Sequence, residues 1–123
     1  MLKLLLDEHI SPQVAAGLSR RESKLLVFAL NQWQTGRFVG VPDAELLTAA
    51  ATEGLTLVTY DRRTIPPLLK RWAEEERDHG GVVFVDDSTI PSSNIGGLVR
   101  ALHALWKEAA QWDWANRACL LRR

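Results

Sequence analysis

Short apolar segments alternate with amphipathic stretches along almost the whole chain. Four segments rich in Leu, Val and Phe predict buried strands at residues 3–6, 25–28, 55–59 and 82–85. Apolar residues recur at helical spacing between and after these segments, which predicts four helices that begin at Ser11-Pro12, Pro42, Thr64 and Asn94. Residues 117–121 predict a fifth strand at an edge of the sheet.

This alternation is typical of right-handed β–α–β units, in which helices cover both faces of a parallel sheet. We therefore expect an α/β fold: a three-layer α/β/α sandwich with a mostly parallel sheet of four to five strands. No linker, internal repeat or low-complexity segment interrupts the pattern, so residues 1–123 are expected to form one domain. The connection 30–41 is long for a compact domain, and such loops often have a function or lie at an interface.

Composition narrows the classes of protein that fit. Apolar residues make up 46% of the chain, which excludes a disordered protein, and no apolar run is long enough to cross a bilayer. The single cysteine, Cys119, cannot form an internal disulfide and fits a reducing compartment, so we expect a cytoplasmic protein that has no contact with membranes.

The charge balance bears on nucleic-acid binding. Fifteen basic residues balance fifteen acidic ones, so the formal net charge is zero. Proteins that hold nucleic acid through its phosphates usually show a basic excess or a basic face. Any such contact here would depend on local patches, for which the candidates are Arg20-Arg21, Arg62-Arg63, Lys70-Arg71 and Arg122-Arg123.

Acidic residues follow three of the predicted strands, where ligands bind in open α/β sheets. These segments are Asp7-Glu8-His9, Thr59-Tyr60-Asp61 and Asp86-Asp87-Ser88, and Asp43 and Glu45 add two acids in the first turn of the second predicted helix. Carboxylates that converge repel one another, and a hard cation such as Mg²⁺ or Mn²⁺ relieves that repulsion. A cation held by oxygen ligands indicates phosphoryl transfer or phosphodiester hydrolysis.

The strand order decides which acids meet, and the sequence leaves two orders open. In the order 2-1-3-4-5, strands one and three are neighbours, so Asp7 and Asp61 would lie side by side. In the order 3-2-1-4, Asp7 would instead lie near Asp86-Asp87.

Each acid also has a structural interpretation. Asp43 and Glu45 complement the dipole of a helix, Asp61 can cap the helix that follows it, and Asp86 before Ser88 resembles turn chemistry. Asp7 is harder to explain in this way, because Ser11 already supplies the helix cap. Glu8 alternates with Asp7 along the chain and so points away from any site that Asp7 faces.

Nearby basic and aromatic residues suggest contacts with ligands or partners. Arg62 and Arg63 are placed to hold a phosphate, and His9 lies beside the acids. The five tryptophans are expected to lie mostly in the core, although three of them, Trp33, Trp112 and Trp114, could instead mark an exposed partner surface.

The ordered set of motifs resembles short PIN-like domains, the group related to VapC-type toxins. The resemblance rests on residues 4–12 (LLLDEHISP), on Pro42–Leu47 (PDAELL), on residues 57–61 (LVTYD), on the glycine-led strand 81–85 and on the segment 90–102. It implies a PIN-like fold that cleaves RNA with Mg²⁺ or Mn²⁺ bound by Asp7, Asp43 and Asp61. Glu8, Glu45 and Asp86 are additional candidates, and Arg62, Arg63, His9 and Thr59 are expected to contact phosphate or RNA. His9 stands where the family usually has asparagine.

Three interpretations of function follow. The first is a metal-dependent endoribonuclease, the toxin component of a toxin–antitoxin pair, with an antitoxin protein and a homodimer as expected partners. The second is a catalytically inactive PIN-like binding module that acts through protein partners, which the zero net charge and the lack of a clear fourth acid favour. The third is another α/β phosphatase or a receiver-like domain, although a receiver would also carry a lysine after a late strand.

Overall fold

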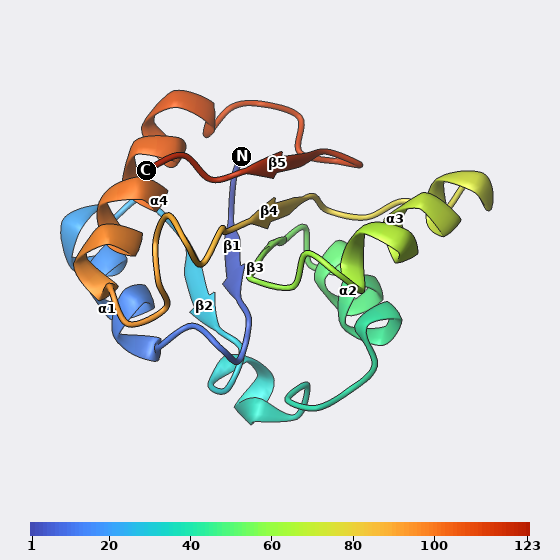
Figure 1. Cartoon of the computed structure of the whole chain (residues 1–123), viewed down its shortest axis with the longest axis horizontal. Helices are drawn as coiled ribbons and strands as arrows, with labels where there is room; N and C mark the ends of the chain where they lie inside the picture. The colour runs from blue at the N-terminus through green and yellow to red at the C-terminus, as the bar shows by residue number, and fades with distance from the viewer.

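Five short strands form one sheet in which every strand is parallel to its neighbours. The computed structural model describes residues 1–123 and has the strand order β2-β1-β3-β4-β5 (Figure 1). The strands are β1 (Leu4–Leu6), β2 (Val27–Ala29), β3 (Thr56–Thr59), β4 (Val82–Phe84) and β5 (Ala118–Leu120). Of the two orders that the sequence left open, the structure has the one that makes β1 and β3 neighbours. The predicted α/β class is confirmed, and the fifth strand lies at the edge.

Four helices and one 3-10 turn connect the strands. The helices are α1 (Pro12–Arg21), α2 (Asp43–Thr52), α3 (Ile65–Glu74) and α4 (Ile95–Ala109), and η1 (Trp33–Gly36) lies in the long connection between β2 and α2. The Ser11 hydroxyl accepts a hydrogen bond from the Gln13 amide at 3.1 Å, so it caps α1 as predicted. None of these helices combines the length and the apolar character that a transmembrane segment needs.

The side chains of β1 divide the core into two layers. Leu4 and Leu6 face one side of the sheet, where they join the buried residues of α1 and α4, whereas Leu5 faces the buried residues of α2 and α3 on the other side. Such alternation is the geometry of a strand that is covered on both faces. It places α1 and α4 on one face of the sheet and α2 and α3 on the other (Figure 1).

The tryptophans lie mostly in the core, as expected, and the alternative of a partner surface fails for two of the three candidates. Trp33 and Trp114 are buried, because Trp33 packs with the α2–α3 layer and Trp114 packs in the α1–α4 layer. Only Trp112 of the predicted trio is open to solvent, with 41% of its surface exposed. The aromatic residues around the sheet therefore serve mainly to fill the core.

The connections through α1 and α4 have opposite hands. α1 joins β1 to β2 and α4 joins β4 to β5, and both helices pack on the same face of the sheet. Because β2 and β5 lie at opposite edges, the two crossovers step in opposite directions across that face. The expectation of right-handed units throughout is therefore wrong for one of them. α4 packs beside α1 on the apolar face of β1, and after it the chain returns to β5 (Figure 1).

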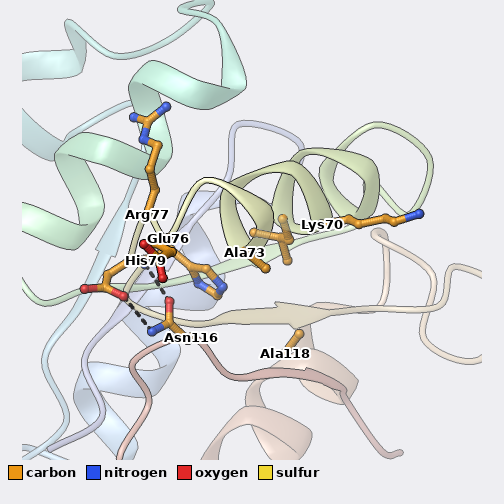
Figure 2. A pocket seen from close by; sticks show the side chains of 9 residues that line it. Lys70, Ala73, Glu76, Arg77, His79, Asn116 and Ala118 are labelled. Carbon is orange, nitrogen blue, oxygen red and sulfur yellow. Dashed lines mark hydrogen bonds between the residues drawn. The ribbon is translucent and has the colours of Figure 1, made fainter.

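A buried histidine stabilises the sheet at the edge opposite the carboxyl ends of the strands. His79 Nδ1 accepts a hydrogen bond from the Gly81 amide at 3.0 Å. The His79 amide donates to Asn116 Oδ1 at 3.0 Å (Figure 2), and the Asn116 amide donates to the His79 carbonyl at 2.9 Å. Gly81 has a φ of +102°, and a Cβ there would lie 2.6 Å from the Trp114 carbonyl oxygen, so only glycine fits. This network joins the start of β4 to the turn that precedes β5.

His79 should make the protein less stable in mild acid. Burial lowers the pKa of His79 from its usual 6.5, and the opposing effect of Asp78 is smaller. The unfolded chain therefore binds a proton at a higher pH than the folded protein does, and the free energy of unfolding should fall as the pH drops below about 6.5. Urea unfolding from pH 7.5 to 5 should show this loss in the wild type.

The matched control for this prediction is His79→Asn. Asn Oδ1 can replace Nδ1 as the acceptor for the Gly81 amide, but it does not titrate in this range. The variant should therefore lack the part of the pH dependence that belongs to His79, and an identical pH dependence in both proteins would refute the assignment.

Candidate active site

The pairing of β1 with β3 brings Asp7 beside Thr59. Leu6 is in register with Val58, and the Asp7 amide donates to the Val58 carbonyl at 3.0 Å. Asp7 is the first residue beyond β1, and Thr59 is the last residue of β3. Both therefore lie at the carboxyl edge of the sheet, where the connection after β1 and the connection after β3 leave for opposite faces.

Both oxygens of the Asp7 carboxylate accept hydrogen bonds. Oδ2 accepts from the Thr59 hydroxyl at 2.5 Å, and Oδ1 accepts from the His9 amide at 2.9 Å. Only 8% of Asp7 is exposed, and this burial raises its pKa, while the bonds from Thr59 and His9 offset the rise only in part. A carboxylate held in this way is fixed in position, and a bound cation would stabilise its charged form.

The pKa of Asp61 is lowered, whereas that of Asp7 is raised. Its Oδ1 accepts hydrogen bonds from the amides of Arg63 at 3.0 Å and Thr64 at 2.8 Å, and its own amide donates to the Thr59 hydroxyl at 3.0 Å. Partial burial alone would raise the pKa of Asp61, but the bonds from Thr64 and Arg63 outweigh it and lower the pKa. Asp61 therefore remains ionised at neutral pH, and it also organises the turn before α3.

The Thr64 hydroxyl connects Asp61 to Asp43. Thr64 Oγ1 lies 3.1 Å from Asp43 Oδ2 and is also within hydrogen-bond distance of Asp61 Oδ2. A hydroxyl has a single proton, so it can donate to only one of these carboxylates at a time. The other carboxylate is then left without that donor beside a like charge, which is a local arrangement that a cation would relieve.

The three aspartates that were predicted to bind a metal line one small cavity. Its volume is about 90 Å³, equivalent to roughly three molecules of liquid water. Asp7, Asp43 and Asp61 all line this cavity, which we call the acidic pocket, together with Glu8, His9 and Thr59. The three aspartates come from the end of β1, the start of α2 and the turn after β3, and only the folded topology brings them together.

The long connection between β2 and α2 supplies an apolar wall of this pocket. Leu30, Phe38 and Val41 line it, and the buried Trp33 stacks on Phe38 with 5.1 Å between the ring centroids. Gln34 and Thr35 have positive φ values of 54° and 57°, which are uncommon for residues other than glycine. The sequence singled out this connection for its length, and the structure places it over the acids.

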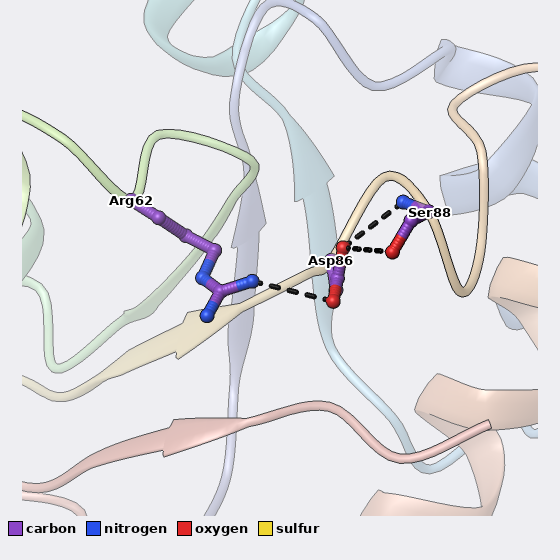
Figure 3. Close-up of polar contacts among 3 residues, drawn as sticks. All are labelled: Arg62, Asp86 and Ser88. Atoms are coloured by element: carbon purple, nitrogen blue, oxygen red, sulfur yellow. Dashed lines mark hydrogen bonds and ion pairs between the residues drawn. The ribbon is translucent and has the colours of Figure 1, made fainter.

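Asp86 lies outside the acidic pocket. Its Oδ1 accepts from the amide and the hydroxyl of Ser88 at 2.9 and 2.7 Å, and its Oδ2 forms an ion pair with Arg62 Nη1 at 3.3 Å (Figure 3). The hydrogen bonds from Ser88 lower the pKa of Asp86, and Arg62 adds to that effect. The structural interpretation of Asp86 as a turn residue accounts for these contacts, and the structure does not bring it to the three aspartates.

The remaining predicted site residues differ in whether they line the acidic pocket and in how exposed they are. Glu8 and His9 are exposed at the rim of the pocket, Glu45 is exposed and does not line it, and Arg63 is exposed beside Asp61. The expected contact of Thr59 with RNA is wrong, because Thr59 is only 2% exposed and its hydroxyl is shared between Asp7 and the Asp61 amide. Thr59 positions the acids and does not reach the surface.

Sequence reasoning missed the part that Thr64 plays at this site. Thr64 was predicted to begin the third helix, but its hydroxyl makes no cap for α3 and turns to Asp43 and Asp61 instead. The available signal was its spacing, since a threonine three residues after an aspartate can bond back to that carboxylate.

The residues of the acidic pocket match a hard divalent cation in their chemistry. No group of three or more acidic, histidine or cysteine side chains is already gathered closely enough to hold a metal ion. The three aspartates nevertheless present carboxylate oxygens to one cavity, and such oxygens are the ligands that Mg²⁺ and Mn²⁺ prefer. Holding an ion with all three would require their side chains to converge further.

Asp7 and Asp61 should have opposite effects on stability. Asp7→Asn should raise the melting temperature of the metal-free protein by a few degrees at pH 7.5, because it removes a buried charge whose raised pKa disfavours folding. The unfolded chain loses the Asp7 proton first, so this gain should shrink as the pH falls towards the usual value of 3.8. Asp61→Ala should instead lower stability by about 1 kcal/mol, because it removes the acceptor for two backbone amides of the turn before α3.

Calorimetric melting of the three proteins without divalent ions tests this pair of effects. A stabilising Asp61→Ala, or an Asp7→Asn variant whose stability relative to the wild type is no higher at pH 7.5 than at pH 4, would contradict the electrostatic description of the pocket.

Comparison with known proteins agrees with this geometry. A family model described as a PIN-like domain matches residues 2–88, more than two thirds of the chain, from before β1 to the turn after β4. The match includes the three aspartates and ends before α4 and β5. No curated protein and no solved structure matches the chain. The extent of the family match shows that this chain belongs to the PIN-like domain family.

Proposed function

We propose that this protein is a metal-dependent endoribonuclease that uses Mg²⁺ or Mn²⁺. The observation that carries the proposal is the convergence of Asp7, Asp43 and Asp61 on one small cavity at the switch point between β1 and β3. Membership of the PIN-like family supports phosphodiester hydrolysis as the reaction class. A cation bound there would activate water and offset the charge that builds up on the phosphate.

The three aspartates and the neighbouring Thr64 have separate roles in this proposal. Asp7 and Asp61 would hold the cation, because Thr59 fixes the first and backbone amides keep the second ionised. Asp43 reaches the same cavity from α2 and would complete the ligand set or orient the attacking water. Thr64 can direct its proton to either Asp43 or Asp61 as the charge between them changes.

The dimensions of the pocket limit what part of the substrate can enter. A cavity of about 90 Å³ has room for a cation with its waters or for a phosphate. The scissile phosphate would therefore enter the pocket, and Arg63 is the unpaired guanidinium placed beside Asp61 to hold it. Arg62 is engaged with Asp86, so it would contact RNA only by leaving that ion pair.

We further propose that the protein is the cytoplasmic toxin of a toxin–antitoxin pair. An antitoxin that covers Glu8 and His9 at the exposed rim of the acidic pocket would block access of RNA to the cation. The exposed Trp112, with Arg117 stacked 4.8 Å above its ring, provides an aromatic anchor of the kind used at protein interfaces, for an antitoxin or for a second copy of the chain.

A catalytically inactive binding module is the second candidate. It is favoured by the absence of a fourth acid from the pocket: neither Asp86 nor Asp87, the two candidates in the sequence, lines it, and Asp86 is bonded to Ser88 and Arg62 instead. In that function the acidic pocket would be a relic of the fold, and the protein would act through its partners alone.

Cleavage of a mixed RNA pool separates the two functions. With Mg²⁺ or Mn²⁺ the wild type should cut RNA, and Asp7→Asn or Asp61→Asn should each lower the rate by at least about 100-fold, as expected for groups that stabilise the transition state through the cation. Asp86→Asn is the matched control, because it removes the same charge outside the pocket, and it should remain active.

The same variants extend the test to cells. Expression without a partner should arrest growth for the wild type and Asp86→Asn, but not for Asp7→Asn. A folded wild type that cuts no RNA with either metal would refute the nuclease and leave the binding module. Cleavage in vitro without growth arrest would refute only the role as a toxin.

A further inference from the structure

A basic groove lies between α1 and α4, on the face of the sheet that these two helices cover. Its volume is about 670 Å³, several times that of the acidic pocket. Three exposed arginines line it, Arg20 and Arg21 from the last turn of α1 and Arg100 from α4. No acidic residue lines the groove, although acidic and basic residues are equal in number in the whole chain.

These arginines have no partners within the chain. None of the three forms an ion pair with a carboxylate or donates a side-chain hydrogen bond, unlike Arg62 and Arg77. Arginine presents several donors in a fixed fork that matches a phosphate group. Three unpaired guanidinium groups around one groove therefore form a site of strongly positive potential that suits a polyanion.

Two glycines give these guanidinium groups room to lie in the groove. A Cβ on Gly96 would lie 3.3 Å from Arg100 Nη1, and a Cβ on Gly17 would lie 4.0 Å from Arg20 Nη2. Gly17 is also required by the close packing of the helices, since its Cβ would come within 2.9 Å of Val99. At Gly96, which lacks the positive φ that would call for glycine, Arg100 is the only group close to the missing Cβ. An alanine at position 96 would therefore force the Arg100 guanidinium to shift its position in the groove.

The groove begins at the same edge of the sheet as the acidic pocket. α1 and α4 both start beyond the carboxyl ends of the strands that precede them, so Gln13 and Gly96 mark the end of the groove nearest to that edge. From Gln13 to Arg21 the groove extends for about 12 Å along α1, at a rise of about 1.5 Å per residue. The first turn of α4 adds the positive end of a helix dipole to the charge of Arg100.

We propose that this groove binds the phosphate backbone of a single RNA strand that extends from the acidic pocket. The inference rests on the proposed function and specifies where the substrate lies outside the cleavage site. It explains how a chain with zero net charge could hold RNA, since the positive charge would be concentrated on one path. An acidic protein segment is the competing occupant, because Ala16, Ile95 and Val99 also line the groove. The phosphate backbone is favoured because three unpaired guanidinium groups surround the groove and no acidic residue lines it.

Binding is measured in an Asp7→Asn background, so that no RNA is cut during the experiment. Fluorescence anisotropy with labelled RNAs of four and twelve nucleotides should show tighter binding of the longer one. Replacing Arg20, Arg21 and Arg100 together by alanine should weaken binding of the longer RNA by about 10-fold or more. It should also reduce the slope of the logarithm of the binding constant against the logarithm of the salt concentration by about 2, since each phosphate contact contributes about 0.7 to that slope.

Two further variants serve as controls. The first is a triple variant that removes the same charge elsewhere on the surface, by alanine at Arg71, Arg122 and Arg123. It should leave the affinity for the longer RNA nearly unchanged. Gly96→Ala should fold at least as well as its background, because alanine favours helix, yet it should weaken binding of the longer RNA by crowding Arg100.

Several results would overturn the proposal. Equal losses in the two triple variants would show that only net charge matters, and unchanged affinity in the groove variant would exclude the groove. Tighter binding of a polyglutamate peptide than of RNA would assign the groove to an acidic protein partner. Metal-dependent cleavage by the unmodified protein tests the acidic pocket separately: no cleavage together with binding that depends on the groove would refute the nuclease and leave the groove as an RNA-binding site.

Discussion

The parallel pairing of β1 with β3 is the contact on which the acidic pocket depends. It brings the first residue after one strand against the last residue of the other, so that the Thr59 hydroxyl donates to Asp7 and accepts from the Asp61 amide. One buried hydroxyl thereby joins the carboxylate of Asp7 to the backbone of Asp61, a residue 54 positions away in the sequence. A shift of one residue in this register would turn Asp7 to the other face of the sheet and separate the pair.

The opposite electrostatic states of these two acids follow from the same arrangement. Asp7 is buried and its pKa is raised, whereas Asp61 is held ionised by the amides of the turn that it caps. In the absence of a cation the pocket therefore holds one charge that folding disfavours and one that folding supports. Charged groups that folding disfavours are common at functional sites, where the protein loses some stability and a bound ligand restores it.

The sequence predicted the parts of the fold that depend on local patterns. The strand segments, the Ser11 cap and the acids after strands are readable because apolar periodicity, capping and strand-end chemistry act over a few residues. The strand order and the position of α4 depend on packing between distant segments, such as Val99 against Gly17, so the sequence alone left them open or gave the wrong hand. The role of Thr64 was missed, and the placement of Trp114 was left open, for the same reason.

Titration of the protein with Mn²⁺ tests the central claim most directly, namely that Asp7 and Asp61, held together by Thr59, form a site for a divalent cation. Calorimetry should show binding to the wild type and to Asp86→Asn, no binding to Asp7→Asn, and an affinity lowered by about 10- to 100-fold in Thr59→Val, since the hydroxyl only positions the ligands. Equal Mn²⁺ affinity in the wild type and in a folded Asp7→Asn variant would contradict the account.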